Sequence, residues 1–389
     1  MRVCGVVAEY NPFHLGHAYH LARAREVTRC DYVAVVMSGS FVERGEPAVM
    51  DKWERAECAL LHGADLVVEL PARFAVRSAD WFARGGVGIL SGMGADALCF
   101  GCESPVDTLL PLAKILCDEP AELRAAIRQG LDRGETLARA RSGALCRLYG
   151  AEEGALSLPN NALAMEYMRA NLLMGEPMEI YGVPRAGDYH AEELPGEGFA
   201  SATAIRSAAM RGEDLSAFVP EATLEKLRDR NRLYDPRRFD DLLIYALRTM
   251  EPERLAHLCD GGEGVENRLI RAAREAGSRE ALLTLAKCKR YTWARLSRLC
   301  AQAMLGLTPR ADEAPRYARV LGFRRSASPL MRRIREKGTI PLCADPSAIK
   351  DDGDLRMDAL ATDIFGLCTG DEALRASGRD FRRKPVIVP

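Results

Sequence analysis

The stretch Glu9-Tyr10-Asn11-Pro12-Phe13-His14-Leu15-Gly16-His17 decides the fold of this chain. It follows a short apolar run at residues 3–7 and precedes a helix-like stretch at residues 18–28. A strand that leads through a glycine turn into a helix suits phosphate groups, because the first N–H groups and the positive dipole end of the helix attract anions. Gly16 has no Cβ, so a nucleotide can lie against the backbone. His14 and His17 can donate hydrogen bonds to phosphate oxygens. A lone histidine would more often cap the helix or pack in the core, but the H-x-G-H pattern after a strand favours nucleotide chemistry.

Alternating strand and helix signals in the first hundred residues predict an α/β fold. Short apolar runs between amphipathic helices indicate a Rossmann-like parallel sheet that is covered on both faces. We expect helices at residues 16–28, 49–62 and 78–90, and strands at residues 3–8, 31–38, 65–70, 97–101 and 178–183. Ligands bind such sheets at the carboxyl ends of the strands, which is where the H-x-G-H turn lies.

The second half of the chain is predicted to be mostly helical. Strand signals nearly vanish after about Pro220, and helical periodicity dominates residues 222–304, with mixed structure from there to residue 389. Helical patterns also cover residues 105–147 and 162–173. We therefore expect an α/β domain at residues 1–215 and a mostly helical region at residues 216–389.

Composition excludes several classes of protein. The chain carries 54 Lys and Arg against 55 Asp and Glu, so its net charge of −1 gives no global sign of nucleic-acid binding. No apolar run approaches the roughly 18 residues of a membrane span, and the N-terminus lacks the apolar region of a signal peptide. The twelve cysteines mostly stand singly, which suits reduced thiols in the cytoplasm. Cys99 and Cys102 form the only C-x-x-C, without a second pair, so we expect no metal site.

Ser201-Ala202-Thr203-Ala204-Ile205-Arg206 is the second candidate for anion binding. Ser201 or Thr203 alone would be an ordinary helix N-cap. With Arg206 one turn into the same helix, the hydroxyls, the free N–H groups and a guanidinium make a second anion cradle.

Two further segments have two possible roles each. The loop at residues 38–48 follows the second strand and faces the ligand crevice, so Arg44 either reaches phosphates or a carboxylate substrate, or pairs with a neighbouring glutamate on the surface. Asn160 and Asn161 precede the helix expected at residues 162–173. Either asparagine could cap that helix or read an adenine edge, and the sequence leaves both open.

Basic residues with interleaved aromatics gather late in the chain and suggest contact with a phosphate backbone. The candidates for this contact are Lys289, Arg290, Arg295, Arg298, Arg324 and Arg325. Tyr291 and Trp293 lie among them. Stacking aromatics suit unpaired bases, and no recognition-helix or zinc-finger pattern occurs, so RNA is expected rather than DNA. The alternative is a solvated charged face.

These motifs together resemble one family, the bacterial tRNA(Met) cytidine acetate ligases, over essentially the whole chain. The matching segments are residues 7–17, 41–48, 63–71, 100–101, 159–161, 201–206 and 317–323. The resemblance implies that ATP activates acetate as acetyl-adenylate, with release of pyrophosphate. The acetyl group then passes to N4 of the wobble cytidine of elongator tRNA(Met). Mg²⁺ is expected with the triphosphate. The first domain would then be a nucleotidyltransferase-like domain that activates acetate with ATP, and the helical region would bind tRNA.

The resemblance also assigns residues to the ATP site. With the cradle, the expected set is Val7, Ala8, Glu9, Tyr10, Asn11, Pro12, Phe13, His14, Leu15, Gly16, His17, Ala18, Tyr19, His20, Gly101, Asn160, Asn161, Arg185, Ser201, Thr203 and Arg206. His14, His17 and Arg44 are the expected catalytic residues.

Three residues depart from the family pattern: Ser40 stands where Asn is usual, Glu43 where Gln is usual, and Cys102 where Ser is usual. The first two put the placement of acetate in question. Two other functions stay open at this point. One is a cofactor adenylyltransferase with a small phosphorylated acceptor, and the other is a non-catalytic RNA-binding protein.

Overall fold

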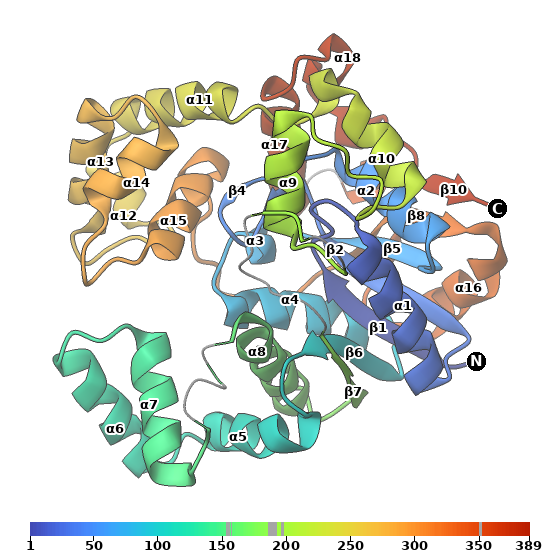
Figure 1. The fold of residues 1–389 in the computed structure, drawn as a ribbon, viewed down its shortest axis with the longest axis horizontal. Coiled ribbons are helices and arrows are strands. Elements are labelled where there is room, and N and C mark those ends of the chain that lie inside the picture. Colours follow the sequence, from blue (N-terminus) through green and yellow to red (C-terminus); the bar gives the residue numbers. More distant parts are fainter. Residues whose placement is uncertain (153–155, 157, 186–192, 196–197, 350–351) are drawn as a thin grey trace.

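The computed structural model describes residues 1–152, 156, 158–185, 193–195, 198–349 and 352–389. Within these residues, an eight-stranded sheet forms the centre of the molecule (Figure 1). Its order is β10-β8-β5-β2-β1-β6-β7, with β9 beside β8. The strands are β1 (Val3–Ala8), β2 (Tyr32–Ser38), β5 (Leu66–Leu70), β6 (Ala97–Cys102), β7 (Glu179–Pro184), β8 (Ala318–Arg324), β9 (Leu342–Cys343) and β10 (Val386–Val388).

The predicted α/β fold is confirmed by the pairing and burial of these strands. From β5 through β2, β1 and β6 to β7, every neighbouring pair is parallel. The run from Val33 to Met37 in β2 is completely buried, as expected for a strand that has helices on both faces. The expected strand at residues 178–183 is β7.

Helices cover both faces of the sheet. Val36 and Val68 point into a core shared with α4, α5, α8 and α16, whereas Val35 and Val67 point into a core shared with α1 and α2. The helices of the first half are α1 (Leu15–Thr28), α2 (Lys52–Leu61), α3 (Ala72–Ala75), α4 (Ala79–Gly92), α5 (Val106–Asp118), α6 (Ala121–Asp132), α7 (Leu137–Tyr149), α8 (Pro159–Leu173), α9 (Ala202–Arg211) and α10 (Glu221–Arg228). Among them, α6 and α7 project from the body beyond α5 (Figure 1).

A helical bundle with its own apolar core follows. Figure 1 shows it in yellow and orange, and its helix α15 lies beside the short hairpin of β3 (Phe41–Val42) and β4 (Glu46–Pro47). Phe239, Leu269 and Leu299 belong to its core. The bundle contains α11 (Pro236–Thr249), α12 (Pro252–Ala256), α13 (Val265–Glu275), α14 (Arg279–Ala286) and α15 (Trp293–Leu305). The later helices are α16 (Ser328–Lys337), α17 (Gly353–Leu367) and α18 (Glu372–Arg375). The C-terminal region is therefore mostly helical, as predicted.

The chain then returns to the sheet, which the sequence did not lead us to expect. Strand β8 pairs antiparallel with β5, and β10 pairs with β8. Arg319 in β8 is only 2% exposed because it joins a buried cluster with Lys52, Glu69 and Asp380. The sequence did not predict this strand because it contains arginines, whereas a buried strand is ordinarily a run of apolar residues. The proposed boundary at residue 215 stays a prediction, but segments beyond it complete the same sheet.

Candidate active site

The H-x-G-H turn links the end of β1 to the start of α1. His14 is the N-cap of α1, and its ring stacks on the ring of His17 with 3.6 Å between centroids and 24° between planes. The backbone N–H of His14 donates to Nδ1 of His17 at 3.3 Å. The proton of a neutral His17 ring therefore lies on Nε2, which makes this atom a hydrogen-bond donor.

Gly16 leaves room for the His14 ring in the histidine stack. A Cβ at this position would lie 2.9 Å from Cε1 and 3.0 Å from Nδ1 of His14. The ring of His14 thus lies where a side chain at this position would lie. The expected contact of a nucleotide with the Gly16 backbone stays a prediction. Glycine is required here so that the first histidine can fold back over the helix start.

The three histidines of this turn are neutral near pH 7. Burial lowers the pKa of His14 to about 3 and that of His20 to about 4, and it holds the pKa of His17 well below the usual value. The nearby positive charge of Arg185 lowers all three further. Within the described residues, neither ring nitrogen of His14 has a hydrogen-bond partner. The His14 ring is therefore an uncharged hydrogen-bonding group that an anion can engage without displacing a protein partner.

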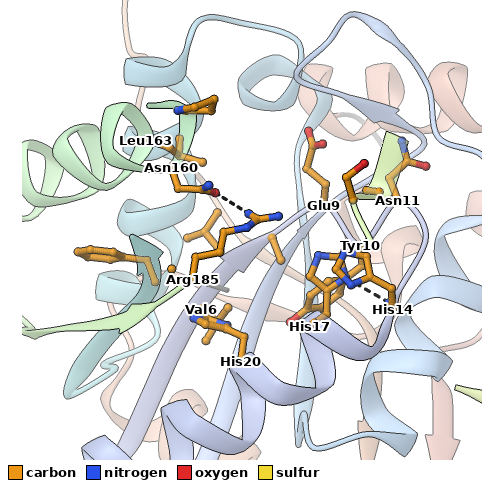
Figure 2. A pocket seen from close by; sticks show the side chains of 18 of the residues that line it. Val6, Glu9, Tyr10, Asn11, His14, His17, His20, Asn160, Leu163 and Arg185 are labelled. Atoms are coloured by element: carbon orange, nitrogen blue, oxygen red, sulfur yellow. Dashed lines mark hydrogen bonds between the residues drawn. The ribbon is translucent and has the colours of Figure 1, made fainter. Parts of the chain in front are cut away.

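A cavity of about 350 Å³ opens at this turn, at the carboxyl ends of β1, β6 and β7 (Figure 2). It is lined by these predicted site residues: Val7, Ala8, Glu9, Tyr10, Asn11, His14, Gly16, His17, Tyr19, His20, Arg44, Gly101, Asn160, Arg185, Ser201, Thr203 and Arg206. Five others predicted for the ATP site do not line it, namely Pro12, Phe13, Leu15, Ala18 and Asn161. Buried Phe13 instead packs against the rings of Tyr10 and His17.

On one wall of the cavity, Arg44 and Arg206 both contact the hydroxyl of Thr203. Thr203 Oγ1 accepts from Nη1 of Arg44 at 3.3 Å and from Nη2 of Arg206 at 3.2 Å. Nη1 of Arg206 also donates to the backbone carbonyl of Asn11 at 2.7 Å, so α9 is tied to the H-x-G-H turn. Ser201 caps α9, where its Oγ accepts from the N–H of Ala204. The two predicted anion cradles therefore meet in one cavity.

Two carboxylates lie beside these arginines. Glu9 Oε1 accepts from the backbone N–H of Glu43 at 2.7 Å, and both glutamates line the cavity. Burial raises the pKa of each carboxyl group. Of the three departures from the family pattern, only Glu43 reaches the cavity. Ser40 is buried with its Oγ 3.1 Å from Thr362 Oγ1, and Cys102 is buried in β6.

The opposite wall carries Asn160 and Arg185, which point toward each other in Figure 2. Nη1 of Arg185 donates to Oδ1 of Asn160 at 2.6 Å, and Nδ2 of Asn160 donates to Glu103. Asn161 is fully buried, and its Oδ1 accepts the backbone N–H groups of Glu103 and Ser104, both at 2.9 Å. Leu158 is the N-cap of α8, so the capping role considered for the two asparagines is wrong. Asn160 faces the cavity, whereas Asn161 holds the loop after β6.

Apolar residues of the cavity escaped the sequence prediction. Phe82, Phe100, Leu163, Tyr167 and Val183 line it near Asn160. The rings of Phe100 and Tyr167 lie 5.7 Å apart. Phe100 and Tyr167 come from β6 and α8, where the apolar pattern of the sequence does not distinguish a residue that lines a cavity from one in the core. We call these five residues the apolar slot; aromatic and aliphatic side chains of this kind suit a purine ring.

The predicted tRNA contacts divide into two groups. Lys289, Arg290 and Arg325 are exposed. Arg295 pairs with Glu263 at 3.0 Å, and Arg324 donates to the backbone carbonyls at the end of α2. Arg298 is 11% exposed and lies between two carboxylates. Arg295, Arg298 and Arg324 are thus engaged within the protein, and exposed Arg290 also lies 3.8 Å from the Glu263 carboxylate.

Two other predicted properties concern metals and membranes. No group of three or more His, Cys, Asp or Glu side chains in the described ranges could hold a metal ion. The twelve cysteines are all free thiols. None of the helices in the described part of the chain has the length and apolar character needed to cross a membrane.

This combination defines a class of protein. A parallel sheet with an H-x-G-H turn after β1, facing a second helix start that carries an arginine, is the arrangement of a nucleotidyltransferase. The family model described as HIGH Nucleotidyl Transferase matches residues 1–380.

Full-length relatives narrow this class. The chain is 37% identical over 399 residues to a tRNA(Met) cytidine acetate ligase of Thermoanaerobacter sp. (strain X514), covering 98% of both chains. It is 33% identical over 410 residues to the enzyme of that name from Clostridium kluyveri, covering 100% of this chain and 99% of the relative. The crystal structure of Thermotoga maritima TmcAL without ligand matches with a TM-score of 0.93 at 32% identity, over 100% of both chains. The form bound with alpha-thio ATP matches with a TM-score of 0.92. The chain belongs to the tRNA(Met) cytidine acetate ligase family, and the resemblance seen in the sequence is confirmed.

Proposed function

We propose that this chain is an ATP-dependent ligase that activates acetate as acetyl-adenylate and transfers the acetyl group to N4 of the wobble cytidine of elongator tRNA(Met). The observation that carries the proposal is the single cavity in which the histidine turn of α1 meets Thr203 and Arg206 of α9. Two relatives named above are called tRNA(Met) cytidine acetate ligases, and one structural neighbour is bound with alpha-thio ATP.

In the first half-reaction, a carboxylate oxygen of acetate attacks the α-phosphorus of ATP and the bond to the β-phosphate oxygen breaks. Acetate is already ionised at neutral pH, so the step needs alignment and charge stabilisation rather than a general base. His17 can donate from Nε2, and His14 has unpartnered ring nitrogens beside it. We assign these rings to the α-phosphate and the leaving oxygen. Arg44, Arg206 and the start of α9 would hold the pyrophosphate and the incoming carboxylate.

In the second half-reaction, N4 of cytidine attacks the acyl carbon, loses a proton, and AMP leaves. This amine is a weak nucleophile, so the acyl group must arrive as a reactive mixed anhydride. Water must be kept from that intermediate. The cavity supports this requirement through the apolar residues of its walls and the buried ring of His14.

The adenine would lie at the Asn160 wall, between the apolar slot and the polar edge formed with Arg185. Mg²⁺ would accompany the triphosphate. No cluster of acidic or other ligating side chains occurs in the part of the chain that the structure describes, so phosphate oxygens and water would supply most of its ligands. The exposed cations Lys289, Arg290 and Arg325 are proposed to contact the tRNA backbone in the cytoplasm, with Arg295 and Arg324 in the wider predicted set.

The direct test is incorporation of labelled acetate into an elongator tRNA(Met) transcript in the presence of ATP and Mg²⁺. Nuclease digestion and mass spectrometry should then locate one acetyl group on the wobble cytidine. A transcript with uridine at that position is the matched control and should accept none. Equal labelling of both transcripts would contradict the proposed acceptor, and labelling without ATP would contradict the proposed activation.

A further inference from the structure

The hairpin loop that carries Arg44 is held from outside the cavity by helix α15. We propose that Arg298 in α15 is a positioning residue that keeps Arg44 in the cavity, rather than a contact for tRNA phosphate. This inference rests on the proposed function, because it concerns the first half-reaction. It assigns the helical bundle a part in acetate activation in addition to its part in tRNA binding.

The first observation is a close backbone approach between the loop and α15. Gly45 has φ +73°, and a Cβ at this position would lie 2.4 Å from the carbonyl oxygen of Ser297 and 2.6 Å from the backbone nitrogen of Arg298. Only glycine allows the two backbones to lie so close. The Ser297 hydroxyl also donates to the backbone carbonyl of Arg44. The residue whose side chain enters the cavity is therefore fixed at its own backbone by α15.

The second observation is a charged link on either side of that contact. Nη1 of Arg298 donates to Oε1 of Glu43 at 3.2 Å, and its Nε donates to Oδ2 of Asp260 at 3.1 Å. On the other side of the loop, Nη1 of Arg279 donates to Oε2 of Glu46 at 3.1 Å. The residues before and after Arg44 and Gly45 are thus both paired with bundle arginines.

Asp260, the carboxylate that holds one end of Arg298, is itself fixed by hydrogen bonds within the protein. Gln302, one turn further along α15, is buried and donates from Nε2 to Oδ2 of Asp260 at 3.0 Å and to the carbonyl of Val76 at 2.9 Å. Arg298 therefore spans from a fixed carboxylate to the loop. At 11% exposure with both ends paired, its guanidinium has little access to a large polyanion.

The third observation is that the inner side of the same loop forms the cavity wall. The backbone N–H of Glu43 donates to Glu9 at the end of β1, and Nη1 of Arg44 reaches Thr203 at the start of α9. A shift of the loop would move these groups together. Loss of the Arg298 link should accordingly misplace Arg44 and weaken its hold on the incoming carboxylate.

The test is acetate-dependent ATP–pyrophosphate exchange without tRNA, measured for Arg298→Ala, Arg44→Ala and the double variant. Arg298→Ala should lower kcat/KM for acetate by about tenfold, mostly through KM, with tRNA affinity retained. Since Arg298 acts through Arg44, adding Arg298→Ala to Arg44→Ala should cause no further loss. Arg271→Ala, an exposed arginine on α13, is the matched control and should leave exchange unchanged.

Arg298→Lys keeps a cation at the same place and should restore part of the activity. If Arg298→Ala does not fold, Arg298→Lys can be combined with Arg44→Ala to make the same comparison of single and double variants. Losses that multiply in the double variant would overturn the proposal, as would unchanged exchange with weakened tRNA binding. Wild-type exchange that fails to depend on acetate would instead refute the proposed function, so the two failures are distinguishable.

Discussion

Lowering the pH from 7.5 to 5 should remove stability through His14, because its ring is buried without a partner among the described residues. The pKa of His14 is lowered from 6.5 to about 3 by burial. Above pH 6.5 the ring is neutral in both the folded and unfolded chain, and its contribution is constant. Below pH 6.5, His14 is protonated in the unfolded chain but stays neutral in the folded chain. The free energy of unfolding therefore falls with pH until the pH reaches the folded-state pKa of about 3.

Over the interval from pH 7.5 to 5 this difference amounts to about 2 kcal/mol for the one ring. The assay is urea denaturation at the two pH values for the wild type and His14→Gln, followed by tryptophan fluorescence. The variant should lose about 2 kcal/mol less than the wild type over the interval. His257→Gln, at an exposed histidine, is the control for replacing an imidazole. An equal loss of stability in the wild type and His14→Gln would refute the reasoning that His14 is buried and neutral.

Three further predictions follow from the site and its surroundings. His17→Ala removes a donor that we assign to the reacting phosphate, so acetate-dependent exchange should fall by about 10²–10³-fold while a filter-binding assay shows unchanged tRNA affinity; unchanged exchange would contradict the assignment. Replacing both Lys289 and Arg290 by alanine should reduce the slope of log Kd for tRNA against log salt by about 1.5; an unchanged slope would remove them from the interface. Lys52→Met leaves two buried carboxylates without their shared ammonium group, which should cost about 3–5 kcal/mol in urea denaturation; a loss below about 1 kcal/mol would show that the cluster does not depend on it.

The fold was predictable where local pattern and burial agree. The alternation over the first hundred residues corresponds to real strands and helices, because the parallel strands there are mostly apolar. Strand β8 was not predictable in this way, since Arg319 is buried only through partners 250 and 61 residues away in the chain, Glu69 and Asp380. Long-range charge pairing leaves no periodic signal in a sequence.

In the candidate site, too, local motifs were predictable from the sequence and long-range contacts were not. The H-x-G-H turn and the Ser201–Arg206 helix start could be found separately, because each is a local motif with its own physical purpose. Their meeting in one cavity depends on the contact of Arg206 with Asn11, which spans 195 residues. The separate positions of Asn160 and Asn161 and the burial of Arg298 likewise depend on neighbours that sequence spacing does not identify.

The measurement that tests the central claim most directly is ATP–pyrophosphate exchange by the purified wild-type protein, with and without acetate and without tRNA. The account predicts exchange that depends on acetate, since the cavity brings together the groups needed to form acetyl-adenylate from ATP. No exchange in the presence of acetate, either alone or after addition of elongator tRNA(Met), would contradict it.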